Sequence, residues 1–196
     1  MRIGLFGGSF NPPHAGHLHA SKVARTYLGL DAVWWLVSPG NPLKDNKATP
    51  SLPERIELCE EMVEDPHIII SGIEADLGTR CTYDTVKALK KLYPSTEFIW
   101  LAGTDIVYEF RRWNEWQKLI REISFAFIGR PTRFGVVKNN VFRQMKPLKN
   151  RNLQCGDLPS LRKGRIYWLF SDPFNPLSST LLRCKASQVE IPTEKK

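Results

Sequence analysis

The sequence predicts an α/β fold, a doubly wound parallel sheet in a single domain over residues 1–196. Short apolar runs of strand length alternate with helical patterns along the chain. These runs are continuously apolar, which is typical of parallel strands that are buried on both faces. Polar, glycine-rich turns follow several of the runs, as expected where ligands bind beyond the carboxyl ends of the strands.

Six segments have the length and composition of buried strands. They comprise residues 2–6, 32–38, 67–73, 96–103, 124–129 and 165–170. The second reads AVWWLVS and the fourth TEFIWLAG, so both are rich in aromatic and aliphatic side chains. Right-handed crossovers between successive parallel strands then favour helices on both faces of the sheet.

Helical spacing of apolar residues fills the intervals between these strands. The first helix begins near His14–His17 and stops at Gly29, and the second begins behind a capping box formed by Ser51 and Glu54. Thr82 is a candidate cap for the third helix. Further helical patterns occupy 113–123, a weakly periodic stretch near 136–145 and a segment that opens at Ser178.

Charge and composition narrow the class of protein. The net charge of +8 is concentrated in residues 130–165, which carry ten Lys and Arg residues against one acid, Asp157. This basic, variable segment indicates either a local anionic partner or a solvated loop. No apolar run approaches the roughly 18–20 residues that cross a bilayer, and the four cysteines form no CxxC pair. We therefore expect a cytoplasmic protein with free thiols.

Residues 7–17, GGSFNPPHAGH, carry the densest candidate chemistry. Gly7 and Gly8 would let a ligand approach the backbone, and the next helix would aim its unpaired amides at the same space. His14 and His17 are three residues apart and would project from one side of the first turn. The stretch predicts a phosphate cradle with two imidazole donors, the alternative being a glycine turn with surface histidines.

This stretch closely resembles the signature of the HxGH nucleotidylyltransferases, which have a Rossmann-like fold. Their H-x-G-H element stands here as His14-Ala15-Gly16-His17, and SSTLLR at 178–183 resembles their second motif. Alone, SSTLLR would be interpreted as a capped helix with a surface arginine. The resemblance implies an ATP site made of Gly7, Gly8, Ser9, Phe10, His17, Gly103, Asp105, Ser178, Ser179, Thr180 and Arg183.

Over residues 1–183 the closer resemblance is to bacterial nicotinate-nucleotide adenylyltransferases. It rests on PGNPLK, TRCTYDT, GTD, RRWNEW and GRP, which begin at residues 39, 79, 103, 111 and 129. The resemblance implies that nicotinate mononucleotide is bound by Asn41, Lys44, Thr82, Trp113 and Arg130. From the residues alone, Trp113 and Trp116 are also consistent with core packing, Asp105 with a helix cap and Lys44 with a loop charge.

The family's activity is transfer of AMP from ATP to nicotinate mononucleotide, which gives nicotinate adenine dinucleotide and pyrophosphate in NAD biosynthesis. The catalytic residues implied are His14, His17, Lys44 and Arg183. Mg²⁺ would accompany ATP, held mainly by phosphate oxygens and water rather than by protein ligands. The partners implied are these small molecules, without membrane or nucleic acid, and a homo-oligomer stays open.

Three departures and two alternatives accompany the resemblance. Asn11 stands where many members have Asp, Cys81 stands where a tyrosine often precedes the threonine, and residues 184–196 form an atypical polar tail. An adenylyltransferase for nicotinamide mononucleotide or phosphopantetheine is the enzymatic alternative. A nucleic-acid-binding protein is the other, with Phe134, Phe142 and Arg143 as stacking groups in the basic segment.

Overall fold

The computed structural model describes residues 1–40, 50–129, 140–145 and 148–170. Its seven strands form one sheet in the order β3-β2-β1-β4-β5-β7-β6, and every neighbouring pair is parallel. The strands are β1 Arg2–Gly8, β2 Ala32–Val37, β3 Ile68–Ser71, β4 Glu97–Gly103, β5 Ser124–Ile128, β6 Lys149–Leu153 and β7 Arg165–Leu169. The predicted parallel α/β sheet is confirmed.

The strand order changes direction between β1 and β4. From β1 the chain builds outward through β2 and β3, then returns to place β4 on the other side of β1. Gly8 is paired with Val37, and Phe6 with Leu101, so the carboxyl ends of β1, β2 and β4 reach the same level. A crevice outside such a switch point is where open α/β sheets bind ligands.

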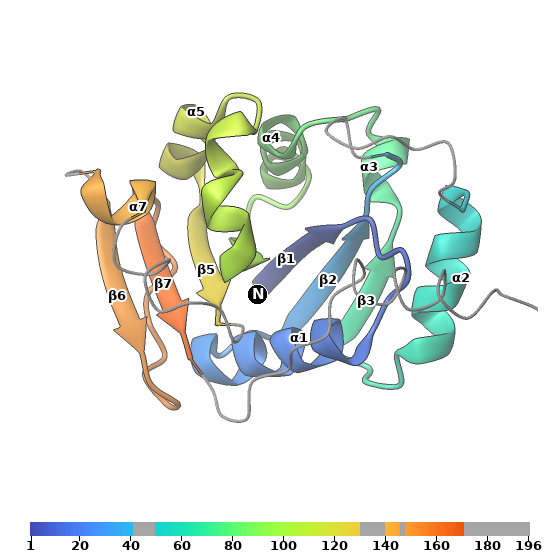
Figure 1. The fold of residues 1–196 in the computed structure, drawn as a ribbon, viewed down its shortest axis with the longest axis horizontal. Helices are drawn as coiled ribbons and strands as arrows, with labels where there is room; N and C mark the ends of the chain where they lie inside the picture. Colours follow the sequence, from blue (N-terminus) through green and yellow to red (C-terminus); the bar gives the residue numbers. More distant parts are fainter. Residues whose placement is uncertain (41–49, 130–139, 146–147, 171–196) are drawn as a thin grey trace, which may run out of the picture.

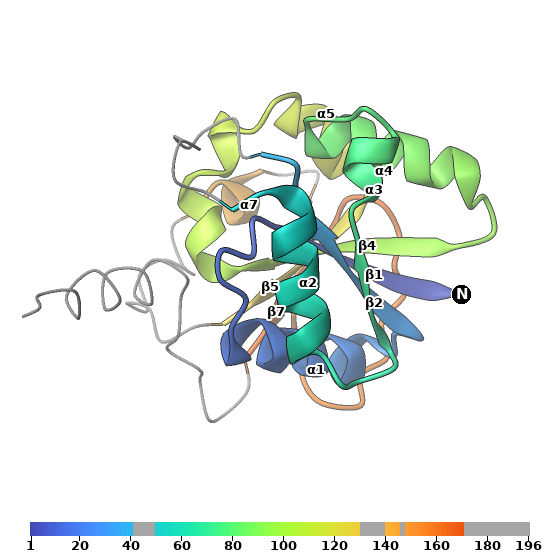
Figure 2. The same ribbon diagram turned by 90° about the vertical axis from the view of Figure 1, so that its right-hand side faces the viewer.

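Helices cover both faces of the sheet (Figure 1). The α-helices are α1 Ala15–Leu28, α2 Leu52–Met62, α3 Ile73–Asp76, α4 Thr82–Leu92, α5 Trp116–Glu122 and α7 Val141–Gln144. Two 3₁₀-helices, η1 Thr104–Tyr108 and η2 Phe110–Arg112, follow β4. The turned view shows α1 on one side of the strands, with α3, α4 and α5 on the other (Figure 2). None of the helices in the described ranges is long and apolar enough to cross a membrane.

Alternate side chains of each strand enter two separate cores. Leu5 and Trp100 belong to the core under α4 and α5, whereas Phe6 and Leu101 belong to the core under α1 and α2. Because successive side chains of a strand point to opposite faces, a continuously apolar strand supplies both cores. The sheet therefore has one group of aromatic residues on each of its two faces.

The helix ends follow two of the three predictions about caps. Gly29 ends α1 in the left-handed conformation, and Ser51 and Glu54 form the predicted capping box of α2. The prediction that Thr82 caps α4 is wrong, because the N-cap is Cys81 and makes no side-chain bond to a helix amide. Thr82 is the first residue inside α4, so it does not occupy the N-cap position from which a side chain binds the unpaired amides of the first turn.

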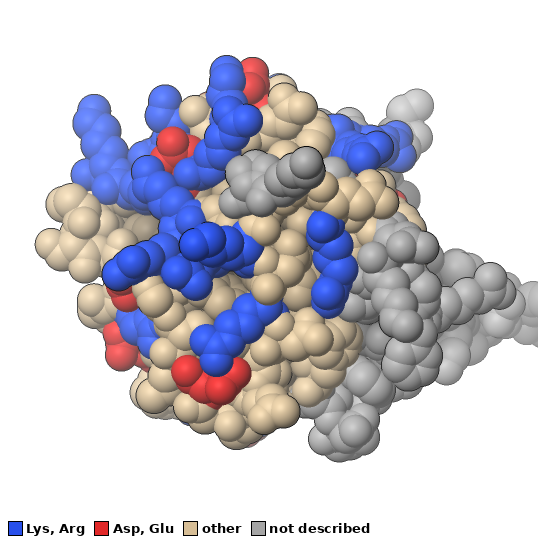
Figure 3. Space-filling view, turned by 90° about the vertical axis from the view of Figure 1, so that its left-hand side faces the viewer, with Lys and Arg blue, Asp and Glu red and all other residues tan. Residues whose placement is uncertain are grey.

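The basic segment is more structured than its weak periodicity indicated. Strand β6 lies within it and was not predicted, while α7 falls inside the stretch near 136–145. Figure 3 shows Lys and Arg side chains gathered on the face that carries the β6 and β7 edge. Several have partners within the fold: Arg151 pairs with Asp157 at 3.2 Å, and Arg143 lies 5.0 Å from the centre of the Trp168 ring.

The remaining predictions concern the start of one helix, the cysteines and the C-terminal segment. The helix predicted over 113–123 begins later, at Trp116, because residues 113–115 form a turn in which Glu115 has a left-handed backbone at φ +53°. Cys59, Cys81 and Cys155 are free thiols, as expected. The helix predicted from Ser178 and the polar tail 184–196 lie outside the described residues.

Candidate active site

The site is built on the junction between β1 and α1, at the carboxyl end of the central strand. His14 is the N-cap of α1, with an extended backbone at φ −157° and ψ 164°. Its Nδ1 accepts a hydrogen bond from the Gly16 amide at 3.1 Å, and the Nδ1 of His17 accepts one from the His14 amide, also at 3.1 Å. Two histidines thus form the reciprocal capping box that Ser and Glu usually provide.

These two hydrogen bonds fix which ring nitrogen carries the proton. An Nδ1 that accepts from an amide has no hydrogen of its own, so the neutral ring is protonated at Nε2. The His14 and His17 rings stack, with centroids 3.8 Å apart and planes at 27°. Both rings are buried, at 4% and 9% exposure. The junction therefore holds two nearly parallel imidazoles, each with its donor at Nε2.

A group of aromatic rings holds His17 in place from the α1 side of the sheet. The His17 ring lies 4.8 Å from Phe10, 5.8 Å from Phe6 and 5.7 Å from Trp35 between centroids. Phe10 stacks on Trp35 at 4.8 Å and 14°. Trp35 Nε1 donates to Ser21 Oγ at 2.8 Å, and that hydroxyl donates to the His17 carbonyl at 2.9 Å. His17 is thus fixed through its ring and its backbone.

The two glycines before the junction serve these aromatic groups. A Cβ on Gly7 would lie 2.6 Å from Trp100 Cζ2, and one on Gly8 would lie 3.2 Å from Phe10 Cε2. We predicted that Gly7 and Gly8 make room for a ligand. The structure adds a second reason for glycine at both positions, because protein ring atoms fill the space that a Cβ would occupy. Their absent side chains let the strand end pack between Trp100 and Phe10.

The other face of the sheet carries Trp113, one of the predicted acceptor residues. Trp113 is half-buried, its ring edge-on to Trp100 at 6.1 Å and tilted against Phe110 at 5.1 Å. Trp100 in turn lies against Gly7, so one indole separates Trp113 from the β1 strand. Trp113 and Trp116 both pack against the core under α4 and α5, as the alternative interpretation required.

The remaining described site residues stand near the ends of strands and helices. Gly103 ends β4, and Asp105 lies exposed inside η1, whose N-cap is Gly103, so Asp105 is not the helix cap that we considered. Thr82 is half-buried at the start of α4. Seven predicted site residues lie outside the described residues: Asn41, Lys44, Arg130, Ser178, Ser179, Thr180 and Arg183.

The sequence analysis missed two buried charged residues beside the site, Arg55 and Glu74. Arg55 precedes the buried Cys59 by one helical turn, so its position on the apolar side of α2 was a usable signal. Glu74 follows β3 in the short helix α3 and had no such signal. Burial raises the pKa of the Cys59 thiol to about 12, against the opposing charge of Arg55, so this thiol is inert at neutral pH.

Glu74 anchors the segment that contains Thr82. Thr85 Oγ1 donates to Glu74 Oε1 at 3.0 Å, and the Thr79 and Thr85 hydroxyls are 2.9 Å apart. The Thr79 amide donates to the Glu74 carbonyl at 2.9 Å. This buried network ties α3 to the first turn of α4, so it fixes the backbone on which Thr82 stands.

We expect Glu74→Gln to change how stability depends on pH. Burial raises the pKa of Glu74, against the lowering effect of the Thr85 hydrogen bond. The folded protein therefore keeps this proton at higher pH than the unfolded chain does. The contribution of this proton to the free energy of unfolding is complete below the unfolded-state pKa of about 4.3. It is lost as pH rises through the folded-state pKa. The glutamine side chain of the variant has no charge to gain over this range.

Urea denaturation at pH 4.5 and pH 8 measures this effect. The free energy of unfolding of the wild type minus that of Glu74→Gln should be smaller at pH 8 than at pH 4.5. Asp76→Asn, an exposed change in the same short helix, is the control and should leave the pH dependence as it is. A wild-type minus Glu74→Gln difference that stays constant with pH would contradict the role of burial at Glu74.

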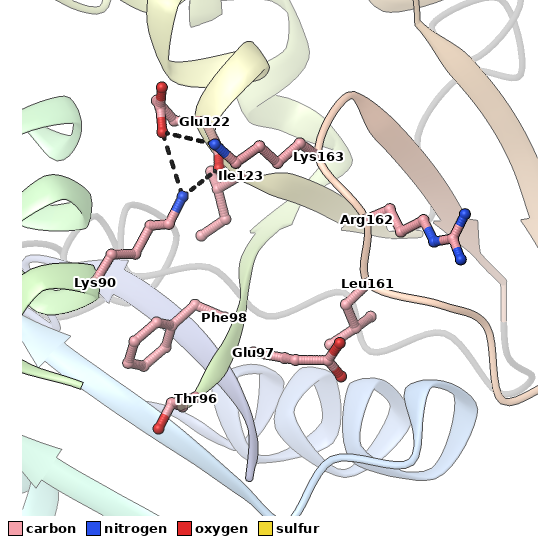
Figure 4. Close-up of a pocket in the computed structure, with 9 residues that line it drawn as sticks. All are labelled: Lys90, Thr96, Glu97, Phe98, Glu122, Ile123, Leu161, Arg162 and Lys163. Atoms are coloured by element: carbon pink, nitrogen blue, oxygen red, sulfur yellow. Dashed lines mark hydrogen bonds and ion pairs between the residues drawn. The ribbon is translucent and has the colours of Figure 1, made fainter. Parts of the chain in front are cut away.

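A cavity lies at the end of the sheet opposite to the histidine-capped junction, near the amino ends of β4, β5 and β7 (Figure 4). Its volume is about 430 Å³, with an apolar floor that includes Phe98 and Ile123. At its rim, Lys90 and Lys163 both reach Glu122, at 3.2 and 3.4 Å. Because one carboxylate serves both ammonium groups, these contacts tie α4, α5 and the chain before β7 together.

The fold and the histidine-capped junction define the class of α/β proteins that bind nucleotides at the switch point of a parallel sheet. Residues 5–185 match the cytidylyltransferase-like family. In the part of the chain that the structure describes, no group of three or more His, Cys, Asp or Glu residues is placed to hold a metal ion. The family match places the chain among nucleotidyltransferase domains.

Relatives narrow the class further. A Brucella suis protein is 38% identical over all of both chains, and a Ruegeria pomeroyi protein is 47% identical over 66% of this chain and 60% of its own. Each is named probable nicotinate-nucleotide adenylyltransferase. The chain belongs to the nicotinate-nucleotide adenylyltransferase family.

Solved structures agree with this fold. Plasmodium falciparum nicotinic acid mononucleotide adenylyltransferase, complexed with APC, superimposes with a TM-score of 0.68 at 17% identity, over 93% of this chain and 82% of that one. The same protein complexed with NaAD gives a TM-score of 0.67 at 18% identity. At this level of identity the superposition demonstrates the shared fold.

Proposed function

We propose that this protein transfers the adenylyl group of ATP to nicotinate mononucleotide, giving nicotinate adenine dinucleotide and pyrophosphate. The observation that carries the proposal is the pair of buried, stacked imidazoles at the N-terminus of α1. Their Nδ1 atoms are held by backbone amides, which makes the Nε2 atoms the hydrogen-bond donors. The full-length relatives named for this activity support the choice of reaction.

The reaction is a single in-line displacement. An oxygen of the nicotinate mononucleotide phosphate attacks the α-phosphorus of ATP, and a bond forms between them. The bond from that phosphorus to the oxygen bridging to the β-phosphorus breaks, and pyrophosphate leaves with the electron pair. Because the attacking phosphate is already ionised at neutral pH, the enzyme needs no general base. Its work is to position the reactants and to neutralise charge.

His14 and His17 are the donors toward the reacting phosphates. A hydrogen bond to a phosphoryl oxygen accelerates the reaction only where it strengthens as charge develops in the transition state. The amides of the first turn of α1 and its dipole favour negative charge at the same place. Rigid histidines suit this task, because their aromatic surroundings and caps remove the cost of orienting them during the reaction.

The other site residues take the roles that the family resemblance implies. We propose that Lys44 and Arg183 neutralise phosphate charge, and that Ser178, Ser179 and Thr180 bind the outer phosphates of ATP. Gly7, Gly8, Ser9, Phe10, Gly103 and Asp105 complete the nucleotide side. Mg²⁺ would arrive with ATP and supply positive charge, held mainly by phosphate oxygens and water. We place the protein in the cytoplasm, with these small molecules as its partners.

The acceptor side is assigned to Asn41, Thr82, Trp113 and Arg130. An indole offers the pyridine ring a flat apolar surface, and stacking on an aromatic side chain contributes about 1–3 kcal/mol per base. The half-buried Trp113 is held between Trp100 and Phe110 without being enclosed. It is therefore the ring that we propose for this contact.

We expect Trp113→Ala to raise the KM for nicotinate mononucleotide about 5- to 150-fold, since a lost stacking contact of roughly 1–3 kcal/mol corresponds to this range. The KM for ATP should change little. Steady-state kinetics with each substrate varied in turn measures both. Trp116→Ala, a second half-buried tryptophan that contacts Phe110 at 6.1 Å, is the matched control. Equal effects of the two variants would mean that Trp113 only supports the core.

Pyrophosphate release from ATP and Mg²⁺ with a panel of acceptors tests the proposed function. Nicotinate mononucleotide should give the highest kcat/KM, ahead of nicotinamide mononucleotide and phosphopantetheine. Equal or faster release with either of these acceptors would overturn the choice of substrate. Release without any acceptor would show ATP hydrolysis instead of adenylyl transfer.

A further inference from the structure

Arg55 is buried although it carries a permanent charge. It belongs to α2, and 2% of its surface is exposed. Arginine is almost never buried to this degree unless it has partners. Burial lowers the pKa of Arg55, against the raising effect of Cys59, but a guanidinium does not lose its proton in a protein. The fold therefore holds a cation close beneath its surface loops.

The recorded partners of this cation are two backbone carbonyl oxygens. Arg55 Nη1 donates to the Ser9 carbonyl at 2.8 Å, and Arg55 Nε donates to the Pro50 carbonyl at 3.0 Å. Within the described part of the chain, no ion pair of Arg55 with a carboxylate is recorded. Carbonyl oxygens orient a guanidinium without neutralising it, so its position is specific and its charge persists.

The two carbonyls belong to the two chain segments that leave the carboxyl ends of β1 and β2. Ser9 follows the β1 glycines and precedes the histidine-capped junction. Pro50 stands directly before Ser51, the N-cap of α2. One guanidinium thus joins the start of the β1–α1 loop to the residue that precedes the N-cap of α2.

The bond to Ser9 also determines the direction of the next amide. In a trans peptide, the carbonyl of one residue and the N–H of the next point in opposite directions. With the Ser9 carbonyl bound to Arg55, the Phe10 N–H faces away from α2. Phe10 has φ +45°, in the left-handed region that a bulky side chain rarely adopts.

Three contacts hold this strained residue. The Phe10 ring is fixed by stacking on Trp35 and by its contact with His17, and the Ser9 carbonyl is fixed by Arg55. Without the guanidinium, the Ser9–Phe10 peptide could rotate and release the left-handed conformation. That rotation would move the ring against which His17 packs.

We propose that Arg55 is a positioning residue for adenylyl transfer. It sets the Ser9–Phe10 peptide so that the Phe10 N–H faces the bound phosphates and the Phe10 ring supports the His17 imidazole. This inference rests on the proposed function, since it assigns Arg55 to the same site. Arg55 acts through Ser9 and Phe10 and does not touch the substrates.

Arg55→Met tests the proposal, because methionine fills much of the same space and donates no hydrogen bond. We expect kcat to fall about 10- to 100-fold, as a small misplacement of reacting groups does, with KM values for both substrates changing less. Arg55→Lys, which can reach one carbonyl but not both, should be intermediate. Ser51→Ala is the matched control, since it breaks the capping box of the same helix without touching Ser9.

A second readout follows the backbone itself. Amide hydrogen exchange at Phe10 should become faster in Arg55→Met and stay at the wild-type rate in Ser51→Ala. Melting temperatures are recorded for every variant, and kinetics are run well below the lowest of them. If Arg55→Met does not fold, Arg55→Lys carries both measurements in its place.

The possible outcomes distinguish a positioning role of Arg55 from a purely structural role and from failure of the proposed function. One outcome is a folded Arg55 variant that has a lower melting temperature but the wild-type kcat and the wild-type amide exchange rate at Phe10. That result would show that Arg55 only stabilises α2, and it would overturn the inference. Equal losses of kcat in Ser51→Ala and Arg55→Met would do the same. If the wild type makes no nicotinate adenine dinucleotide, the proposed function fails, and the exchange rate still decides whether Arg55 sets the Phe10 peptide.

Discussion

His17→Ala is expected to lower kcat about 10²- to 10³-fold, the usual loss when one hydrogen bond to developing charge is removed. The KM for ATP should change far less, because the contact strengthens in the transition state. The geometry supports a large effect: the His17 ring is buried, stacked on His14 and fixed at its Nδ1 by the His14 amide. Steady-state and single-turnover kinetics measure the two quantities.

His19→Ala provides the control for this prediction. His19 is two residues further along α1, about 200° around the helix from His17, so it faces a different direction. Its replacement should leave kcat close to the wild-type value. If His17→Ala instead raises the KM for ATP and leaves kcat unchanged, His17 binds the ground state and the transition state equally, which contradicts its assigned role.

Trp35→Ala should lower the free energy of unfolding by about 3–5 kcal/mol, as large-to-small changes in a core do. Trp35 is fully buried in β2, stacks on Phe10 and donates to Ser21 Oγ. The variant leaves a cavity under Phe10 and His17 and removes the partner of a buried hydroxyl. Urea denaturation measures the loss, and kcat should fall as well because the support of His17 is gone.

Trp34→Ala is the natural comparison. Trp34 is the neighbour of Trp35 in β2, points to the other face of the sheet and is partly buried against Tyr93 and Phe98. It should cost less stability and leave kcat near the wild-type value. A loss below about 1 kcal/mol for Trp35→Ala would mean that the core closes over the cavity, and that Trp35 is not the support described.

Much of the fold was predictable because its strands are buried on both faces. Continuous apolar runs identify β1, β2, β3, β4, β5 and β7, and their alternation with helices identifies the parallel sheet. Strand β6 was missed because its sequence, KNRNL, contains a single apolar side chain. As the edge strand, it needs little burial, and its basic residues suit an exposed edge.

Part of the candidate site was likewise predictable from local sequence, and part depends on contacts between distant residues. The local signal at residues 7–17 identifies His14 and His17, because helix caps and glycine turns depend on neighbours in sequence. The partners of Arg55 could not be predicted, since Ser9 lies 46 residues away and only the folded chain brings its carbonyl to the guanidinium. Likewise, the role of Gly7 depends on Trp100 of another strand.

The two faces of the sheet contribute different halves of the proposed chemistry. The α1 side supplies the histidines and the aromatic rings that hold them, and the α4–α5 side supplies Trp113 and the Thr82 segment. They meet where the strand order changes direction, so ATP and its acceptor can approach from opposite faces.

The most direct test of the central claim follows the α-phosphorus of ATP. The purified protein is incubated with Mg²⁺, ATP labelled at the α-phosphate and nicotinate mononucleotide, and the products are separated. The label should appear in nicotinate adenine dinucleotide in equal amount to the pyrophosphate released, with none attached to the protein. Label that stays in ATP, appears as AMP in place of the dinucleotide, or becomes bound to the protein would contradict direct adenylyl transfer.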